Sequence, residues 1–222
     1  MSIIRFTSII FLVVTSVILL TSCMSKESSA EELYTVLEKV VEAEKEFEGQ
    51  QGPLVELEEE EKEIYNEIMT VGMKAHEKIA VLSDEALSNI EKRENHLQIE
   101  IDSINASKTQ FKKAEEIIKK IKDPDQKKKA EELSELMMER YQLHTILSKE
   151  YSKALKSDKE LYLMLKESDI SYDKLEAHVS DLNNAYQKVL EANEEFNDLT
   201  AEYNKKKLEY YKLAGLNLEK EK

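Results

Sequence analysis

The sequence predicts an all-α protein, an elongated antiparallel up-and-down four-helix bundle with coiled-coil-like packing. The 222 residues include only four Gly, two Pro and no Trp, which is too few turn-forming residues for a sheet protein. Glu, Lys, Leu and Ala are abundant, and no β-rich run follows residue 23. In two long segments an apolar residue recurs every seven positions, which is typical of helices that cross at about 20°. A single extended coiled-coil dimer is the structural alternative, but the evenly spaced turns favour a chain that folds back.

The first helical segment is expected to begin near Glu31, with Ser29 as its N-cap. We expect a break at Gly49-Gln50-Gln51-Gly52-Pro53, because two Gly and a Pro within one short stretch end or kink a helix. The apolar pattern resumes after this stretch as far as residue 82, and a second break is expected at Ser83-Asp84. The sequence leaves open whether the first break is a kink or a full hairpin.

Three long helices with short turns are expected in the rest of the chain. The first of them ends at Asp123-Pro124-Asp125, a turn by composition, and the next ends at Ser168-Asp169-Ile170-Ser171. The last ends at Gly215. Helices of about 40 residues are about 60 Å long, and short connections make neighbours antiparallel. The expected bundle domain comprises residues 31–215, followed by a flexible tail at residues 216–222.

Residues 1–22 have the layout of a lipoprotein signal peptide. One positive charge, Arg5, precedes a long apolar run, which ends in Leu20, Thr21 and Ser22 before Cys23. A branched apolar residue and two small residues before a Cys form a lipobox, because the thiol takes a diacylglyceryl group before the signal is cut. We expect the mature chain to begin at Cys23, to carry acyl chains such as palmitate, and to stay on the outer face of the cell membrane. Residues 23–30 would be the lipidated tether.

Other interpretations of the apolar run remain open. It could be an uncleaved transmembrane anchor, since about 18 apolar residues approach the roughly 20 that a helix needs to cross a bilayer. It could also be a secretory signal with an incidental Cys, or a buried core helix, although no polar face interrupts it. Every interpretation that involves a membrane places the bulk of the chain outside the cell.

Composition and motifs argue against several classes of function. The formal net charge of −14 is unsuited to nucleic acid, which needs a basic face. The chain has a single Cys, so its lipidation leaves no thiol for a disulfide, a thiolate metal site or a nucleophile. No His-Glu-x-x-His pattern, Gly-rich phosphate loop or Gly-x-Ser-x-Gly elbow occurs. We therefore expect no catalysis, no cofactor and no metal site. The four scattered histidines are expected to be partly buried or at the surface: His76, His96, His144 and His178.

Ten tyrosines stand beside five Phe. The seven-residue pattern places three of them in the core: Tyr186, Tyr203 and Tyr210. Others are expected at the surface or its boundaries: Tyr34, Tyr65, Tyr162, Tyr172 and Tyr211. Exposed tyrosines can stack on sugar rings, but a ring that packs while its hydroxyl stays wet is the simpler interpretation.

Charge is unevenly distributed along the chain. Residues 31–63 contain 13 acidic and 3 basic residues, whereas residues 108–129 contain 9 basic and 4 acidic ones. Six lysines define a Lys-rich turn around Pro124: Lys119, Lys120, Lys122, Lys127, Lys128 and Lys129. If the first helix kinks without reversing, this turn returns to the membrane end, where it could touch anionic lipid or teichoic-acid phosphates. If residues 49–53 form a hairpin, the turn points to the wall. Alternatively, the lysines merely complement helix ends.

Three features resemble a known family: the lipobox Cys23, an acidic first helix with Glu56-Leu57-Glu58-Glu59-Glu60-Glu61, and even helices broken at Asp123-Pro124-Asp125. By these features the chain resembles the YkyA-like cell-wall-binding lipoproteins of Gram-positive bacteria over nearly the whole mature part. The resemblance implies a helical bundle on the outer face of the membrane. It brings no ligand residues that can be carried over to this sequence.

The function expected from these observations is that of a membrane-anchored, extracytoplasmic, non-catalytic module that binds the cell wall or acts as a spacer. The polymer would be peptidoglycan or teichoic acid. The alternative is a scaffold that recruits or regulates a protein partner, such as a wall hydrolase, through helix–helix contacts. A solute- or metal-binding lipoprotein is a third interpretation.

Overall fold

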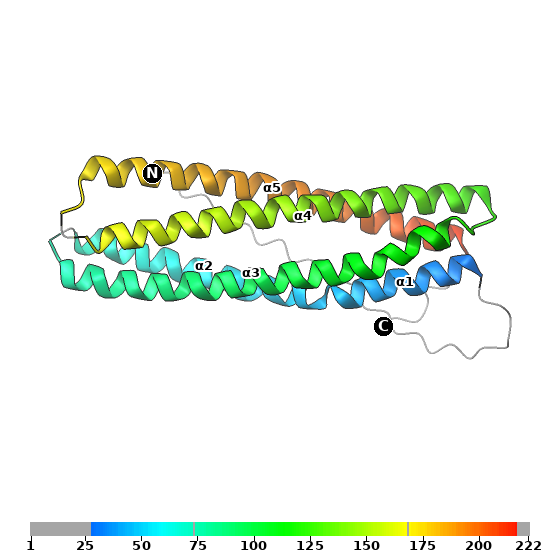
Figure 1. Cartoon of the computed structure of the whole chain (residues 1–222), viewed down its shortest axis with the longest axis horizontal. Coiled ribbons are helices and arrows are strands. Elements are labelled where there is room, and N and C mark those ends of the chain that lie inside the picture. Colours follow the sequence, from blue (N-terminus) through cyan, green and yellow to red (C-terminus); the bar gives the residue numbers. More distant parts are fainter. Residues whose placement is uncertain (1–27, 73, 168, 217–222) are drawn as a thin grey trace.

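Five helices form four antiparallel segments of similar length in a computed structural model, which describes residues 28–216 except Met73 and Ser168. The helices are α1 (Ser29–Ala43), α2 (Lys45–Val71), α3 (His76–Ile118), α4 (Pro124–Leu165) and α5 (Tyr172–Leu213). Helices α1 and α2 follow one another along α3, α3 packs on α4, and α4 packs on α5 (Figure 1). The predicted all-α, up-and-down bundle is confirmed. With 42 residues, α4 is about 63 Å long.

The bundle is a rod with two different ends (Figure 1). We call one the α1 end, because it holds the start of α1, the turn between α3 and α4, and the end of α5. We call the other the far end; it holds the turn between α2 and α3 and the turn between α4 and α5. The ring of helices closes between α5 and α1, since the Tyr211 hydroxyl donates to Glu38 at 2.9 Å and the Tyr34 and Tyr211 rings lie 4.9 Å apart.

The break in the first long segment is a kink at Glu44, not at residues 49–53 as the sequence predicts. In an uninterrupted helix the Phe47 N–H would donate to the Ala43 carbonyl. Here the Ser103 hydroxyl of α3 lies between them: it donates to Ala43 O at 2.7 Å and accepts from Phe47 N at 3.1 Å. A side chain inserted into the backbone ladder is a recognised cause of kinks. Because the chain does not reverse at this point, the open question of kink or hairpin is resolved as a kink.

Helix α2 passes through the predicted break with Pro53 inside it. Pro53 has no N–H to donate to the carbonyl of Gly49, four residues earlier. Gly49 and Gly52 are exposed, and an added Cβ at either would meet nothing within 4 Å. The lost hydrogen bond is therefore on the solvent side, where water can bind the Gly49 carbonyl and the helix can continue.

The second break also differs from its prediction. Ser83 and Asp84 lie inside α3, where Ser83 is fully buried, and the chain reverses about ten residues earlier. Gly72 ends α2 with a φ of 73°, a backbone conformation that favours glycine. Its N–H donates to Ile68 O at 3.3 Å, which satisfies one of the last carbonyls of the helix.

The remaining helix boundaries agree with the predicted stop signals. Asp123 is the N-cap of α4 and accepts from Asp125 N and Gln126 N, with Pro124 in the first turn. Ser171 caps α5, and Gly215 follows the end of α5 with a φ of 67°. At the start of α1 the cap is Ser28 rather than Ser29, and Glu31 completes a capping box with it.

The apolar core consists of two clusters, one in each half of the rod. The half at the α1 end contains Leu37, Phe111 and Met137, and the far half contains Ile79, Ile90 and Leu155. The tyrosine prediction was wrong for two residues: Tyr162 and Tyr211 are buried. Tyr203 and Tyr210 are buried as predicted, Tyr34, Tyr65 and Tyr186 are half-buried, and Tyr172 is 74% exposed.

Candidate functional site

Each half of the rod buries one arginine. Arg93 of α3 is 1% exposed and Arg140 of α4 is 3% exposed. Of the 32 Lys and Arg residues in the chain only three are arginines, and these two are the only ones in the described part. An arginine suits burial better than a lysine, because its planar fork satisfies several acceptors at once and it is more weakly hydrated.

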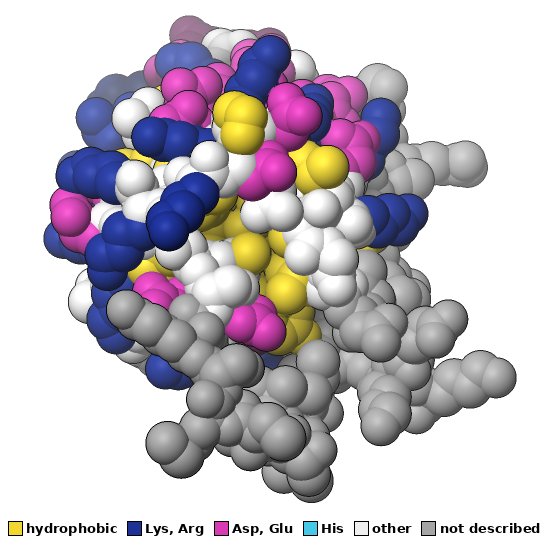
Figure 2. Space-filling model, turned by 90° about the vertical axis from the view of Figure 1, so that its right-hand side faces the viewer, with side chains coloured by type: hydrophobic (Ala, Val, Ile, Leu, Met, Phe, Trp, Pro, Cys, Tyr) yellow, Lys and Arg dark blue, Asp and Glu magenta, His cyan; other side chains and the backbone are white. Residues whose placement is uncertain are grey.

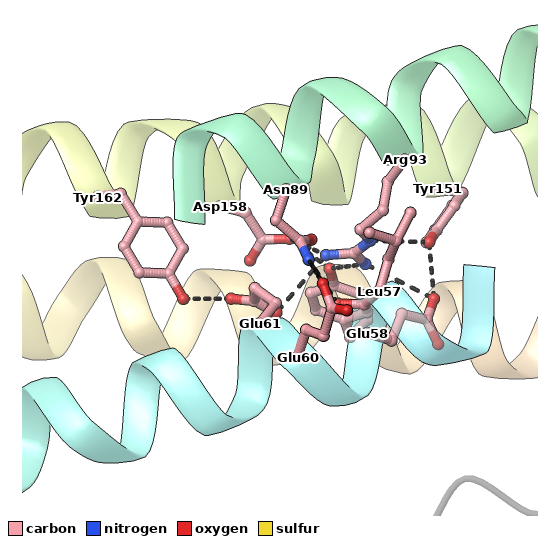
Figure 3. Close-up of polar contacts among 10 residues, drawn as sticks. Leu57, Glu58, Glu60, Glu61, Asn89, Arg93, Tyr151, Asp158 and Tyr162 are labelled. Carbon is pink, nitrogen blue, oxygen red and sulfur yellow. Dashed lines mark hydrogen bonds and ion pairs between the residues drawn. The ribbon is translucent and has the colours of Figure 1, made fainter. Parts of the chain in front are cut away.

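Three carboxylates surround Arg93 in the far half (Figure 3). Its Nη1 lies 3.5 Å from Glu61 Oε2 and 3.6 Å from Asp158 Oδ2, and its Nη2 lies 3.6 Å from Glu58 Oε1. The three carboxylates come from α2 and α4. We call Arg93, the three carboxylates and their tyrosine partners the Arg93 cluster. One buried cation among three acidic groups leaves an excess of negative charge unless some carboxylates hold protons.

Tyrosine hydroxyls complete the Arg93 cluster. Arg93 donates to Tyr151 OH at 3.1 Å and to Tyr186 OH at 2.8 Å. Each of these hydroxyls donates onward to a carboxylate: Tyr151 to Glu58 at 2.6 Å and Tyr186 to Asp158. Figure 3 shows Tyr162 donating to Glu61 from the other side of the cluster. The tyrosines that the sequence places at the core and its boundary therefore serve as hydrogen-bond donors to buried acids.

Burial changes the proton affinity of these acids. It raises the pKa of Asp158 to about 7 and raises that of Glu58, because a poorly solvated site disfavours a carboxylate, while the Arg93 charge opposes both shifts. Glu100 of α3 accepts from Gln51 near this cluster, and burial raises its pKa to about 8, with a smaller contribution from the charge of Glu58. The far half therefore holds acids that titrate near neutral pH.

Arg140, in the half at the α1 end, has surroundings in which one carboxylate balances its positive charge. It donates to Thr200 Oγ1 at 2.9 Å and to Glu44 Oε1 at 2.8 Å, and its guanidinium lies 4.9 Å from the centre of the Phe196 ring. Ser107 also donates to Glu44, at 2.6 Å. Glu44 is the residue at the kink between α1 and α2. We call this group the Arg140 cluster; it fixes the kink to α4 and α5 with one cation and one carboxylate.

Neither arginine cluster has the features of an active site. Arg93 and Asp158 are almost fully buried, and the guanidinium lies where a bound cation would need to be. Among the described residues no group of three His, Cys, Asp or Glu side chains could hold a metal ion. The histidines have separate partners: His96 contacts Gln50, His144 contacts Ser148 and His178 contacts Ser157. The arrangement can specify register and bind protons.

The Lys-rich turn lies at the α1 end of the rod. The Ser29 hydroxyl, at the start of α1, donates to the Lys120 carbonyl at 3.4 Å. Ile118 and Ile121 pack in the same apolar cluster as Leu33 of α1. The sequence left open whether this turn lies at the same end as the start of the first helix or at the opposite end. In the structure it lies beside the start of the first helix.

The lysines of this turn differ in their partners. Lys119 pairs with Glu116 at 2.6 Å, and Lys129 pairs with Glu132 at 3.1 Å. The other four form no ion pair with any residue that the structure describes: Lys120, Lys122, Lys127 and Lys128. In Figure 2, which faces this end, basic side chains crowd one side of the described surface.

A second basic segment, which the sequence analysis missed, reaches the same end. The last turns of α5 contain four lysines and one glutamate between residues 205 and 212. Lys206 lies 3.9 Å from Glu132 and Glu209 lies 3.8 Å from Lys129, so this segment runs beside the start of α4. The two segments are about 80 residues apart in the sequence, which hides their proximity. The signal available in the sequence was the run Lys205-Lys206-Lys207 itself.

The predicted lipidation site lies outside the described residues. Cys23 and its motif, Leu20 to Ser22, precede residue 28, and so does most of the tether. None of α1 to α5 combines the length and the apolarity that a membrane crossing requires. Of the predicted tail only Leu216 is described, and it packs against the apolar cluster of the α1 end.

The chain is similar to known proteins over nearly all of its described part. The family described as "Putative cell-wall binding lipoprotein" (YkyA) matches residues 28–213. A protein of Bacillus subtilis (strain 168) described as "Uncharacterized lipoprotein YkyA" is 38% identical over 203 residues, which cover 91% of each chain. A 1.6 Å crystal structure of a conserved protein of unknown function from Staphylococcus aureus has a TM-score of 0.61 at 21% identity, and covers 84% of this chain and 97% of that one. This last similarity concerns the fold alone.

Proposed function

Since the chain belongs to the YkyA family of lipoproteins, we propose that it is a lipid-anchored, non-catalytic rod on the outer face of the membrane, and that its far end contacts the cell wall. The observation that carries this proposal is the direction of the first long segment. Helices α1 and α2 kink without reversing, so they lead from the α1 end to the far end. A chain anchored before α1 would present the far end away from the membrane.

The short distance between the anchor and the bundle supports this orientation. Four residues lie between Cys23 and Ser28, the N-cap of α1, so five Cα-to-Cα steps join them. An extended chain spans at most about 3.6 Å per residue, so lipid on Cys23 would hold the α1 end within about 18 Å of the membrane surface. The length of α4, about 63 Å, then separates the far end from the membrane.

The surface of the far end suits contact with a wall glycan. Four of the large apolar side chains that the rod exposes lie within six residues of the helix ends here: Met69, Val81, Leu163 and Tyr172. Tyr172 is the most exposed of them, at 74%. An exposed aromatic ring is suited to stack on the apolar face of a sugar. We assign the wall contact to this surface.

A non-catalytic role fits the disposition of the titratable groups. The perturbed acids of the far half are buried among helices, and each has a tyrosine or amide partner. A general acid or base must reach a substrate proton within hydrogen-bond distance, which these positions do not allow without separating the helices. They are better explained as part of the packing.

Retention of the lipid-free chain on purified cell-wall sacculi tests the proposal. The chain from Met24 to Lys222 should be retained, and Tyr172→Ala should weaken retention about 3- to 10-fold, equivalent to about 0.7–1.4 kcal/mol. Leu208→Ser is the matched control, because Leu208 is an exposed apolar residue at the α1 end. Equal retention of the three proteins would overturn the assignment to the far end. Absence of retention, with salt-insensitive capture of one protein partner instead, would favour a scaffold.

A further inference from the structure

We propose that the α1 end is a docking surface for anionic lipid headgroups, and that four lysines of the Lys-rich turn make the contacts: Lys120, Lys122, Lys127 and Lys128. The inference rests on the proposed function in one respect, since it takes the membrane that holds the lipid of Cys23 as the partner. It adds a second, electrostatic attachment and thereby an orientation of the rod. The partner is the headgroup surface itself, not a soluble phosphate polymer.

Proximity to the membrane is the first argument. The Ser29 hydroxyl contacts the Lys120 carbonyl, so the turn lies beside the first residues of α1. The chain before α1 is too short to lift this end by more than about 18 Å. This height is about two Debye lengths at physiological ionic strength. Thermal motion of the rod on its tether therefore brings the lysines into the electrostatic field of the membrane surface. A tether of this length keeps the local concentration of headgroups high.

The uncommitted charge of the turn is the second argument. Lys120, Lys122 and Lys128 are exposed and Lys127 is half-buried, and none of the four has an ion pair among the described residues. The chain as a whole carries −14, so a concentration of unpaired positive charge at one end runs against its composition. A surface of phosphates is the complementary partner that a membrane offers.

Helix ends do not account for these positions. Cations are favourable near the C-terminus of a helix, which explains Lys119 and Lys120 after α3. Lys127 and Lys128 instead lie near the positive end of α4, where the helix dipole does not favour cations. The helix dipoles therefore account for only part of the positive charge of the turn.

The second basic segment extends the surface and gives it an apolar component. Leu208 and Leu213 of α5 are 46% and 45% exposed. Lys205, Leu208 and Lys212 are spaced three and four residues apart and therefore share one face of α5. Lysines that flank exposed leucines are typical of helices that lie in the headgroup region of a membrane. The adjoining face of α5 lies beside the start of α4, because Lys206 and Glu209 contact Glu132 and Lys129.

The test uses the intact lipidated protein in vesicles. A fluorophore on Glu131→Cys reports on the Lys-rich turn, one on Glu77→Cys reports on the far end, and Cys23 does not react because its sulfur is in a thioether. Both positions are exposed. Quenching by headgroup-labelled lipid is compared between phosphatidylcholine vesicles and vesicles that also contain phosphatidylglycerol. We expect quenching at residue 131 that requires phosphatidylglycerol and disappears at high salt, and none at residue 77.

Charge reversal identifies the lysines. The variant Lys120→Glu, Lys122→Glu, Lys127→Glu, Lys128→Glu should lower the docking equilibrium constant on the order of 100-fold. The matched control Lys74→Glu, Lys92→Glu, Lys174→Glu, Lys188→Glu changes the net charge equally at exposed lysines elsewhere and should dock like the parent. Equal docking of both variants would overturn the proposal.

Two further arms separate the alternatives. A soluble glycerol-phosphate polymer that binds the four lysines, while phosphatidylglycerol produces no docking, would assign the surface to a wall polymer and overturn the proposal. Protein that fails to float with either kind of vesicle would show that no lipid anchor is present, which is a failure of the proposed function and not of the lysine surface.

Discussion

In the half of the rod at the α1 end, Arg140 pairs with one carboxylate, that of Glu44, whereas in the far half Arg93 lies among Glu58, Glu61 and Asp158. Glu44 is 17% exposed, and Glu58 and Glu61 are similar at 19% and 16%, but Asp158 is only 2% exposed. The first arginine is neutralised by a fixed charge. Around the second arginine, protons remove part of the surplus negative charge, because burial raises the pKa values of Glu58 and Asp158.

The surfaces of the two ends also differ, but not in the way that the interiors do. The α1 end carries the unpaired lysines of the Lys-rich turn together with the exposed Leu208 and Leu213, and the far end carries the exposed Tyr172. The charge of the interior in one half of the bundle therefore does not predict the charge of the surface at that end. The interior sets register and stability, and the two ends carry different surfaces.

Removal of each arginine should have the largest effects and should separate the two halves. Arg93→Met leaves the buried Asp158 and the half-buried Glu58 and Glu61 without their cation, and should lower the free energy of unfolding by about 3–5 kcal/mol. Arg140→Met leaves a single carboxylate that water can reach, and should cost about 1–3 kcal/mol. Urea denaturation at pH 7 measures both. Equal losses, or a larger loss for Arg140→Met, would contradict the distinction between the clusters.

The pH dependence of stability should come from the far half. Between about pH 6.5 and pH 8 the folded chain holds protons on Glu100 and, in the lower part of that interval, on Asp158, whereas the unfolded chain has released them. The free energy of unfolding should therefore fall as the pH rises, by about 1–2 kcal/mol over the interval. His144, whose pKa burial lowers from 6.5 to about 4, contributes mainly below this interval.

Substitution of Glu100 isolates this dependence. Glu100→Gln removes the titrating group, keeps a hydrogen-bonding partner for Gln51, and should flatten most of the fall between pH 6.5 and pH 8. Glu94→Gln is the control, because Glu94 is an exposed residue of the same helix and should leave the profile unchanged. Thermal melts across the interval provide the comparison. A profile that rises with pH in the parent protein would refute the assignment.

The kink in the half at the α1 end offers a smaller effect. Ser103→Ala removes the hydroxyl between Ala43 O and Phe47 N, and should cost about 1–2 kcal/mol because two partly buried backbone groups lose their partner. Ser152→Ala, at an exposed position of α4, controls for the higher helix propensity of Ala. Amide exchange at Phe47 should accelerate in the first variant alone. Unchanged exchange there would show that the helix closes the gap by itself.

Changes at the ends should have the smallest effects on stability. Tyr172→Ala and Leu208→Ser each remove an exposed side chain, and each should change the free energy of unfolding by less than about 0.5 kcal/mol. Chemical denaturation checks this expectation. A larger loss in either variant would mean that the residue supports the fold, and its binding data could not then be assigned to a surface.

The sequence predicts the fold where local chemistry decides it. Asp123 and Pro124 form a cap and a first helical turn from their own backbone and side-chain properties, and Gly215 ends α5 for the same reason. It fails where a distant residue decides. The kink at Glu44 depends on Ser103, almost 60 residues away, and Pro53 continues its helix because its side of the helix faces water.

The candidate sites were predictable in the same uneven way. The Lys-rich turn is visible as a run of lysines, but its place beside the start of α1 depends on the direction of the kink. The Arg93 cluster joins residues of α2, α3, α4 and α5, and no spacing along the chain indicates it. The scarcity of arginine among so many lysines was the one available sign.

The orientation of the rod on the membrane is the claim on which the rest depends. The height of a fluorophore on Glu77→Cys above a supported bilayer, measured by energy transfer to a dye in the membrane, tests it in the intact lipidated protein. A standing rod predicts a height on the order of 60 Å, with a fluorophore on Glu131→Cys close to the surface. Both fluorophores within about 20 Å, the thickness of two helix layers, would mean that the rod lies flat and would contradict the account.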